Sequence, residues 1–390
     1  MTRTPKVCLV SHTYLEKRYR GKLSRLAQSV DLTVITPEQF PFPYGTYHAD
    51  FSEPRSYAVR AYPCRFPLGI RTSTRWVLAT RDLGFRTVQP DIIHVENEAH
   101  SFSLLQALVC RRRYVRRAKA IAFVWSNMSL PGLRGHGLNL MARLMRAGID
   151  HYIAGNSDAK RLLIASGIPD DRISVFPQVG VDVDYYKPPL AEERSRLRSE
   201  MGFGPGDFVV GFVGRFVQDK GIPDLLEAVR RLREMRKVAR VRLMCVGDGP
   251  LKSSLPAGCP DVTVASPGGA GRVLPYYQVM DVLVLPSRSV PRWKEQFGLV
   301  LVEAMACGVP VVGSNSGAIP EVMGNAGCVF KERDAADLAA RLCALMAAPG
   351  QRLAMGEAGR KRALDTFSHS RVAEQMYQTY QQVLSGEQPR

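Results

Sequence analysis

The alternation of short apolar segments with helix-like segments constrains the fold of this chain more than any other feature. Val7–Ser11 and Ile92–Val95 are continuous apolar runs in the first half. Phe208–Gly214 and Val282–Pro286 repeat the pattern in the second half. Runs of this length, separated by helices, are typical of strands in a parallel sheet that is covered on both faces. The 390 residues therefore predict two doubly wound α/β domains, with a linker at Tyr185–Pro189.

One stretch of the first half departs from this alternation. Gln39–Pro67 is rich in Pro, Tyr and Phe and has neither helical nor strand periodicity. Unstructured connections of this length are uncommon in compact domains and are usually functional. We therefore expect a long functional loop or insertion here.

The charge of the chain is strongly positive and unevenly distributed. There are 53 Lys and Arg residues against 36 Asp and Glu, a net charge of +17. Residues 1–187 hold 27 basic and 15 acidic residues, so +12 of the excess lies there. Such a field favours anionic partners, either nucleic acid, acidic lipid headgroups or phosphorylated substrates. No nucleic-acid-binding motif accompanies the charge, so we do not expect nucleic acid as a partner.

Cysteine spacing and the length of the apolar runs indicate the compartment. The eight cysteines include no CxxC pair, which argues against a zinc module or a disulfide framework and for a reducing cytosol. The first strand begins without the long apolar stretch of a signal peptide. The longest apolar runs, such as Val279 to Pro286, are far shorter than the roughly 20 residues that span a bilayer. We expect a cytoplasmic protein whose membrane contact, if any, is peripheral on the inner face.

A pair of cations follows the first strand of the second domain. Gly214 allows a sharp turn after the strand, and Arg215 and Lys220 then flank one loop. In open parallel sheets, ligands bind beyond the carboxyl ends of the strands. The planar fork of Arg and the point charge of Lys could together clamp a diphosphate. The alternative is a pair of solvated cations.

A helix that is apolar on all sides, except for one carboxylate, follows a later strand. Its first-turn N–H groups, around Gly298, Leu299 and Val300, form an anion site without any side chain. Glu303 lies one and a half turns further along, and a carboxylate among apolar neighbours needs partners such as the two hydroxyls of a ribose. The alternative is a carboxylate on the helix surface. Glu295, in the preceding loop, could hold hydroxyls of a group attached beyond the phosphates.

A glycine turn completes this set of motifs. Gly247 and Gly249 bracket Asp248 in a turn that is common on its own. As a set, the motifs resemble the signature of the retaining GT-B glycosyltransferases of family 4, over roughly residues 150–385. The motifs that carry the resemblance are Gly214-Arg215, Lys220-Gly221, Val246-Gly-Asp-Gly-Pro250, Pro286-Ser287, the E-x7-E pair Glu295 and Glu303, and Gly317-Ala-Ile-Pro-Glu321.

The resemblance implies an architecture and a reaction. It implies a Rossmann-like acceptor domain at residues 1–187, completed by a C-terminal helix at about 371–390, and a Rossmann-like donor domain at 188–370, with a cleft between them. The implied donor is a nucleoside diphosphate sugar, for which we favour UDP, and transfer retains the configuration of the anomeric carbon. No metal or other cofactor is required by this pattern, since cations and helix N–H groups can take the leaving-group charge.

The resemblance also implies a role for each donor-site residue. Arg215 and Lys220 would hold the diphosphate, Glu303 the ribose, and Glu295 with the Gln296–Leu299 backbone the sugar and β-phosphate. The loop Gly268–Leu274 would meet the base. Glu295, Arg215 and Lys220 are the expected catalytic groups. The expected donor-binding set is Gly214, Arg215, Lys220, Gly247, Asp248, Arg272, Val273, Glu295, Gln296, Phe297, Gly298, Leu299, Val300 and Glu303.

The first domain departs from the family pattern, and the acceptor stays open. One glycine, Gly21, stands where many relatives have a paired-glycine loop, and Asn127 takes the place of a His. Asn cannot act as a general base but can hydrogen-bond a sugar. His12 could contact the acceptor or serve a local turn. Glu96 and Glu98 could contact the acceptor or lie in a solvated loop.

A basic run in the first domain suggests a second kind of partner. Arg111–Lys119 holds six basic residues in nine positions, after a predicted helix at Ser103–Cys110. Such a run is usually a solvated helix end, where cations suit the helix dipole. The alternatives are an anionic membrane surface or an acceptor linked to a polyprenyl phosphate.

Two functions of different classes follow from these observations. The first is a retaining glycosyltransferase acting on a hydroxyl of a glycan, a lipid-linked intermediate or a small molecule. The second is a non-catalytic protein that binds nucleotide sugars on the same fold. The presence of Arg215, Lys220, Glu295 and Glu303 together favours the enzyme, because a scaffold does not need all four.

Overall fold

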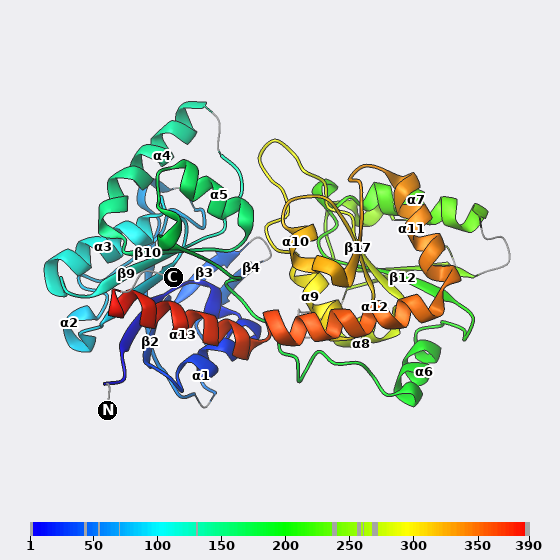
Figure 1. The fold of residues 1–390 in the computed structure, drawn as a ribbon, viewed down its shortest axis with the longest axis horizontal. Coiled ribbons are helices and arrows are strands. Elements are labelled where there is room, and N and C mark those ends of the chain that lie inside the picture. The colour runs from blue at the N-terminus through cyan, green and yellow to red at the C-terminus, as the bar shows by residue number, and fades with distance from the viewer. Residues whose placement is uncertain are drawn as a thin grey trace. The chain divides into compact units, whose positions relative to one another are not determined.

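The chain forms two compact units, each with its own parallel sheet (Figure 1). Unit 1 contains Met1–Gly180 and His369–Arg390, and unit 2 contains Val181–Ser368. The predicted pair of doubly wound α/β domains is confirmed. The computed structural model describes residues 3–42, 45–53, 55–69, 71–129, 132–235, 240–255, 259, 261–266 and 272–386.

The sheet of unit 1 has seven strands in the order β11-β10-β9-β8-β1-β2-β5, and all neighbours in it are parallel. Strand β1 lies between β2 and β8, so the strand order reverses beside it. The carboxyl ends of β1 and β8 therefore flank the point where open sheets bind ligands. The strands are β1 (Lys6–Val10), β2 (Asp31–Pro37), β5 (Ala58–Tyr62), β8 (Ile92–Glu96), β9 (Lys119–Val124), β10 (His151–Ala154) and β11 (Ile173–Val175).

Helices cover both faces of this sheet, because successive residues of its buried strands point to opposite sides. In β8, Ile93 packs with Leu104 of α3 on one face. Ile92 packs with Leu23 of α1 and Met376 of α13 on the other face. The helices are α1 (Gly21–Leu26), α2 (Phe85–Val88), α3 (Phe102–Tyr114), α4 (Gly132–Met145), α5 (Ser157–Ala165) and α13 (His369–Ser385).

Residues 39–67 contain more regular structure than the sequence predicts. Strands β3 (Gln39–Phe42) and β4 (Gly45–His48) pair antiparallel, and β5 pairs parallel with β2 at the sheet edge. The expectation of a loop throughout this stretch is therefore wrong. Strand β5 has five residues and none of them is fully buried, so it lacks the continuous apolar run that reveals a central strand.

The sheet of unit 2 has six strands in the order β14-β13-β12-β15-β16-β17, all of them parallel. The order reverses between β12 and β15. The strands are β12 (Phe208–Val213), β13 (Val241–Val246), β14 (Val262–Ala265), β15 (Val282–Leu285), β16 (Val311–Ser314) and β17 (Gly327–Phe330). The helices are α6 (Ala191–Glu200), α7 (Ile222–Met235), α8 (Leu274–Val279), α9 (Leu299–Ala306), α10 (Ile319–Met323), α11 (Ala335–Ala347) and α12 (Pro349–Arg362).

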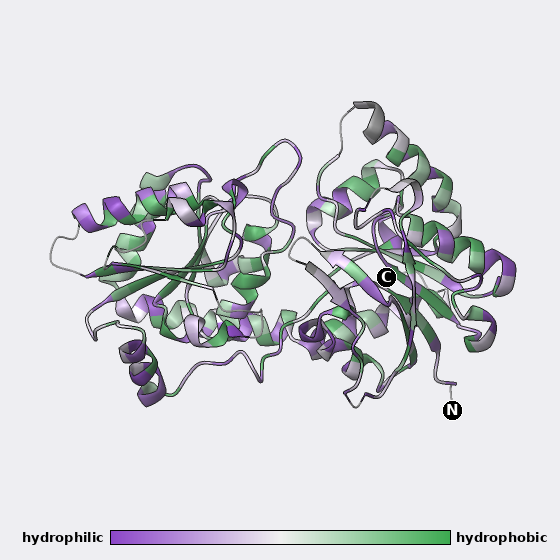
Figure 2. Ribbon diagram, turned by 180° about the vertical axis from the view of Figure 1, so that it is seen from behind, coloured by the Kyte–Doolittle hydropathy of each residue, from purple (hydrophilic) through white to green (hydrophobic). Residues whose placement is uncertain are grey.

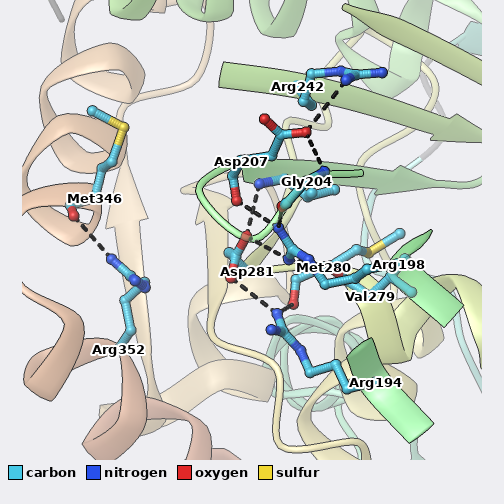
Figure 3. A network of polar contacts seen from close by, with 11 residues as sticks. Arg194, Arg198, Gly204, Asp207, Arg242, Val279, Met280, Asp281, Met346 and Arg352 are labelled. Carbon is cyan, nitrogen blue, oxygen red and sulfur yellow. Dashed lines mark hydrogen bonds and ion pairs between the residues drawn. The ribbon is translucent and has the colours of Figure 1, made fainter. Parts of the chain in front are cut away.

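Helix α6 is strongly hydrophilic (Figure 2), and charged contacts fix it to the sheet. Asp281, just before β15, accepts hydrogen bonds from Arg194 at 2.9 Å and Arg198 at 3.1 Å (Figure 3). The same carboxylate accepts the N–H of Val209 in β12 at 2.8 Å. These bonds hold α6 at the amino ends of β12 and β15, which leaves the carboxyl ends for other contacts.

Apolar residues are concentrated in the strands of both sheets, as Figure 2 shows. Among the helices that the structure describes, none combines the length and the apolar character needed to cross a membrane.

Candidate active site

Lys220 and Glu295 form an ion pair at the carboxyl edge of the unit 2 sheet. Lys220 ends a short 3₁₀ turn after β12, and Glu295 lies in the loop after β15. Their Nζ and Oε2 atoms are 2.5 Å apart, with 14% and 9% of the side chains exposed. The residues meet because β12 and β15 are parallel neighbours that end at the same edge. Each residue is expected at the site from its own motif, but no local pattern in the sequence predicts that the two pair.

Two further side chains hold this ion pair in place. Ser287 donates its hydroxyl to the same oxygen of Glu295 at 2.8 Å. The ring of Trp293 lies 4.7 Å from the ammonium of Lys220, a distance at which the ring face attracts a cation. Neither contact was expected from the sequence, although Ser287 belongs to one of the quoted motifs.

A bidentate ion pair ties together the two loops that carry these residues. Arg288 donates through Nε and Nη2 to the carboxylate of Asp224 in α7, at 2.7 and 2.5 Å. The N–H of Arg288 also donates to the backbone oxygen of Asp219, one residue before Lys220. Bidentate Arg–carboxylate pairs fix geometry as well as charge. The loop after β15 is thereby fixed against the turn that presents Lys220.

Glycines allow the strand-end loops to approach one another closely. Gly221 has a φ of +67°, and a Cβ there would lie 1.8 Å from the backbone oxygen of Pro286. A Cβ on Gly247 would lie 1.9 Å from the backbone oxygen of Gly214. Only glycine fits these positions. The expected donor residues Gly214 and Gly247 thus bring the ends of β12 and β13 together.

Helix α9 presents its N-terminus beside Glu295. Gly298 precedes it with a φ of +78°, and the helix runs from Leu299 to Ala306. The first-turn N–H groups, including those of Leu299 and Val300, have no acceptor within the helix and carry partial positive charge. The side chain of Phe297 packs against Phe367, with ring centroids 5.7 Å apart.

Glu303 is buried on α9 and hydrogen-bonded to a tyrosine. It is 4% exposed, so the alternative of a helix-surface carboxylate is wrong. Tyr277 of α8 donates its hydroxyl to Oε2 at 2.7 Å. Burial, followed by the charge of Glu303, raises the pKa of Tyr277 well above its ordinary value, so this hydroxyl remains a donor. Tyr277 provides one of the partners that the sequence required, and binding of a ribose stays a prediction.

The other expected donor residues differ in exposure. Arg215 is exposed, and its side chain has no hydrogen bond or ion pair to another described residue. Asp248 is exposed, and the N–H of Gly249 lowers its pKa. Arg272 is exposed, while Val273 is buried next to α8. Within the loop expected to meet the base, residues 268–271 lie outside the described residues.

In unit 1, Glu96 forms a buried polar network with residues far away in the sequence. It accepts hydrogen bonds from Lys22 at 2.8 Å, Tyr14 at 2.7 Å and Gln178 at 2.9 Å. Its side chain has no exposed surface, and that of Lys22 has 1%. The solvated-loop alternative for Glu96 is therefore wrong, and its contact with an acceptor stays a prediction. Glu96 joins β8 to α1 and to the segment after β11.

The other acceptor-side candidates lie near the ends of β1 and β9. His12 packs against Phe40 and Trp76, with ring centroids 4.5 and 5.6 Å apart, and burial lowers its pKa to about 4. Glu98 accepts the N–H groups of Trp125 at 3.2 Å and Ser126 at 3.3 Å. Burial raises the pKa of Glu98. Glu98 lies in the loop after β8 and is partly exposed, so both of its alternatives stay open.

Of the two further candidates on this side, Asn127 is buried and Gly21 is partly exposed. Asn127 is 5% exposed. A Cβ on Gly21 would lie 2.2 Å from the ring of His369, so Gly21 permits α1 to pack against α13. Contact of His12, Gly21, Glu98 or Asn127 with an acceptor stays a prediction.

Comparison with known families gives one match in each unit. The model described as Glycosyltransferase Family 4 matches residues 22–185, and the one described as Glycosyl transferases group 1 matches residues 207–348. A structure of a glycosyltransferase from Rickettsia africae has a TM-score of 0.73 at 15% identity, covering 99% of this chain and 100% of that chain. At this identity the likeness concerns the fold alone, and that fold is GT-B.

Curated relatives match over part of their length. The D-inositol 3-phosphate glycosyltransferase of Segniliparus rotundus is 31% identical over 227 residues, which is 55% of this chain and 48% of that protein. The GDP-mannose-dependent alpha-(1-6)-phosphatidylinositol monomannoside mannosyltransferase of Mycolicibacterium smegmatis is 36% identical over 198 residues, 48% of this chain and 51% of that protein. The matches therefore span about half of each relative. With both family models in chain order on a GT-B fold, the chain belongs to the group 1, family 4 glycosyltransferases.

Proposed function

We propose that this chain is a retaining glycosyltransferase that moves a sugar from a nucleoside diphosphate sugar to a hydroxyl acceptor. The observation that carries the proposal is the Lys220–Glu295 pair beside the N-terminus of α9. A cation and free N–H groups suit the diphosphate, while a carboxylate suits the hydroxyls of the sugar. The two parts of such a donor thus find complementary groups at one edge of one sheet.

Each group has one task in the proposed reaction. Arg215 and Lys220 bind the diphosphate and stabilise the charge that gathers on it as the bond to the sugar breaks. When the donor binds, Glu295 separates from Lys220 and accepts hydrogen bonds from hydroxyls of the transferring sugar. Glu303, held by Tyr277, accepts the ribose hydroxyls. These cations and N–H groups take the leaving-group charge, so the proposed reaction uses no metal.

The proposed donors are UDP-sugars, and GDP-mannose is the second donor to test because the name of the M. smegmatis relative specifies it. The proposed acceptor is a hydroxyl of a glycan, a lipid-linked intermediate or a small molecule. The nucleotide base of the donor is expected to contact the loop around Arg272.

The test is release of nucleoside diphosphate from UDP- and GDP-sugars, with and without a panel of hydroxyl acceptors. The proposal expects release that an acceptor accelerates, and a product whose anomeric configuration, read by NMR, equals that of the donor. Tight donor binding without release under any acceptor would favour the non-catalytic alternative. A product of inverted configuration would overturn retention.

A further inference from the structure

Helices α3 and α4 of unit 1 expose large apolar side chains in two short rows. On α3, Leu105 is 41% exposed and Val109 57%; on α4, Leu140 is 57% exposed and Leu144 75%. Residues four apart share one face of a helix, so each pair forms a stripe along its helix. Exposed apolar side chains that gather in this way mark interaction sites more often than single ones do.

The two helices also line a groove. It has a volume of about 510 Å³, and its walls include Leu108 and Val109 of α3 and Leu144 of α4. Arg112 and Arg116 also line it, while Asp and Glu are absent from the described residues that form its walls. The groove therefore combines an apolar lining with a cationic side. We call the groove and the exposed faces of α3 and α4 the α3–α4 surface.

The charge of this region has one sign only. Residues 99–149 contain nine Lys and Arg and no Asp or Glu. Two of the cations in the run 111–119 are used internally, because Asp150 pairs with Arg111 at 2.9 Å and with Lys119 at 3.3 Å. The four that remain exposed are Arg112, Arg113, Arg116 and Arg117.

We propose that the α3–α4 surface docks on an anionic lipid bilayer. Leu140 and Leu144 enter the boundary between headgroups and acyl chains, and the arginines contact lipid phosphates, as in interfacial helices. A bilayer satisfies both features of the surface, whereas nucleic acid offers phosphates but nothing for the exposed leucines. The docking does not depend on the proposed function, since none of the donor-site residues belongs to this surface.

The test is co-sedimentation of the full chain with vesicles. One set is pure phosphatidylcholine, and the other contains about 30% phosphatidylglycerol, whose surface potential attracts basic segments. We expect binding to the anionic vesicles only, and its reduction in about 0.5 M NaCl through screening. Absence of binding to anionic vesicles at low salt would overturn the proposal.

Two double variants with matched controls locate the contact. Arg112→Gln/Arg116→Gln removes two charges, each worth roughly fivefold in partitioning near an anionic surface, so binding falls by tenfold or more. Leu140→Gln/Leu144→Gln removes the apolar contact and lowers binding by a factor on the order of ten. All four side chains are exposed, so the fold tolerates these changes.

The controls make the same changes elsewhere. Arg25→Gln/Arg240→Gln removes two exposed arginines, one on α1 at the opposite face of the sheet and one in unit 2. Leu190→Gln/Leu353→Gln removes leucines of unit 2 that are 78% and 67% exposed. Controls that bind like the unchanged protein support the proposal. Equal losses in variants and controls would show adsorption by net charge and overturn it.

A titration with DNA tests the remaining alternative, which is a site that binds any polyanion. The unchanged protein and the leucine variant are titrated with duplex DNA of mixed sequence at the same salt. The proposal expects DNA to bind more weakly than anionic vesicles. DNA binding of similar strength, together with unchanged vesicle binding by the leucine variant, would identify a general polyanion site instead.

Discussion

The ammonium of Lys220 lies 2.5 Å from Oε2 of Glu295, although 75 positions separate the two residues in the sequence. The cation that is expected to hold phosphate and the carboxylate that is expected to hold sugar thus neutralise one another's charge. The proposed donor separates them, because its phosphates replace Glu295 at Lys220 and its hydroxyls replace Lys220 at Glu295. Both new contacts form in the same binding event.

Replacing Lys220 by Met removes a charged contact to the diphosphate while keeping the length of the side chain. We expect affinity for UDP or GDP to fall by an amount corresponding to about 1.5–3 kcal/mol, by calorimetry. Lys331→Met, at an exposed position of unit 2, is the control. Unchanged nucleotide affinity in a folded Lys220 variant would refute the assignment.

The double variant Lys220→Met/Glu295→Gln separates binding from stability. Lys220→Met alone leaves the buried Glu295 carboxylate without its cation, which destabilises the fold. A neutral glutamine relieves that effect, so the double variant should regain stability in urea unfolding. It should not regain nucleotide affinity. Recovery of both would mean that Lys220 acts only through Glu295.

The two glutamates should have different effects on ligand binding. Glu303→Gln should weaken binding of the nucleoside diphosphate itself, since the ribose is present without a sugar. Glu295→Gln should spare the nucleoside diphosphate and lower turnover, since its target is the transferring sugar. Calorimetry and the release assay measure the two effects. Equal loss of nucleotide affinity in both variants contradicts this division.

Tyr277→Phe tests the hydrogen bond that supports Glu303. Without the hydroxyl, a buried carboxylate oxygen loses a donor at 2.7 Å, which costs about 1–3 kcal/mol of unfolding free energy. Tyr276→Phe, at the neighbouring and partly exposed position, should change stability little. Urea unfolding checks both variants. A Tyr277 variant as stable as the unchanged protein would show that Glu303 does not depend on this donor.

The donor side could be predicted largely because its motifs are local. Gly298 immediately precedes the short helix that contains Glu303, and an apolar helix with one carboxylate indicates a satisfied buried group. The partner that satisfies it was not predictable, because Tyr277 lies 26 positions away on another helix. Pairing across elements depends on strand order, which no local pattern contains.

Glu96 illustrates the same limit in unit 1. For a carboxylate after a buried strand, the sequence left two alternatives, contact with an acceptor or a place in a solvated loop, and it did not predict an internal ion pair. The ion-pair partner of Glu96, Lys22, comes from α1, 74 positions earlier, and the two charges neutralise one another inside the unit. Strand β5 was missed for a different reason: it is a short edge strand without a buried apolar run.

Buried histidines make the fold sensitive to acid. Burial lowers the pKa of His12, His94 and His151 to about 4, against an ordinary value of 6.5. Between these two values the unfolded chain binds more protons than the folded one, so the free energy of unfolding falls as pH falls from about 6.5 to 4. A shift of this size corresponds to stability on the order of 3 kcal/mol for each fully buried group.

A variant of His94 tests this effect of buried histidines on the pH dependence of stability. His94 is 1% exposed, and its Nδ1 lies 2.8 Å from the hydroxyl of Tyr380. Among the described residues its buried Nε2 has no hydrogen-bond partner, and the desolvation of the charged form outweighs its attraction to Glu96. His94→Gln should therefore reduce the dependence of unfolding free energy on pH between 6.5 and 4. His136→Gln, at an exposed position, should leave that dependence unchanged, and a similar slope in both variants would contradict the account.

Metal removal should leave turnover intact. The proposed reaction uses Arg215, Lys220 and the N–H groups of α9 to stabilise the leaving diphosphate. Treatment with EDTA, followed by the release assay in metal-free buffer, should retain most of the activity. Complete loss that is restored by a divalent cation would show that these groups are insufficient.

A crystal structure with a bound nucleoside diphosphate tests the central claim most directly. The account predicts phosphate oxygens about 3 Å from the ammonium of Lys220, the ribose hydroxyls at the carboxylate of Glu303, and the Lys220–Glu295 pair opened. Phosphates bound elsewhere on the chain, or an intact ion pair beneath a bound nucleotide, would contradict it.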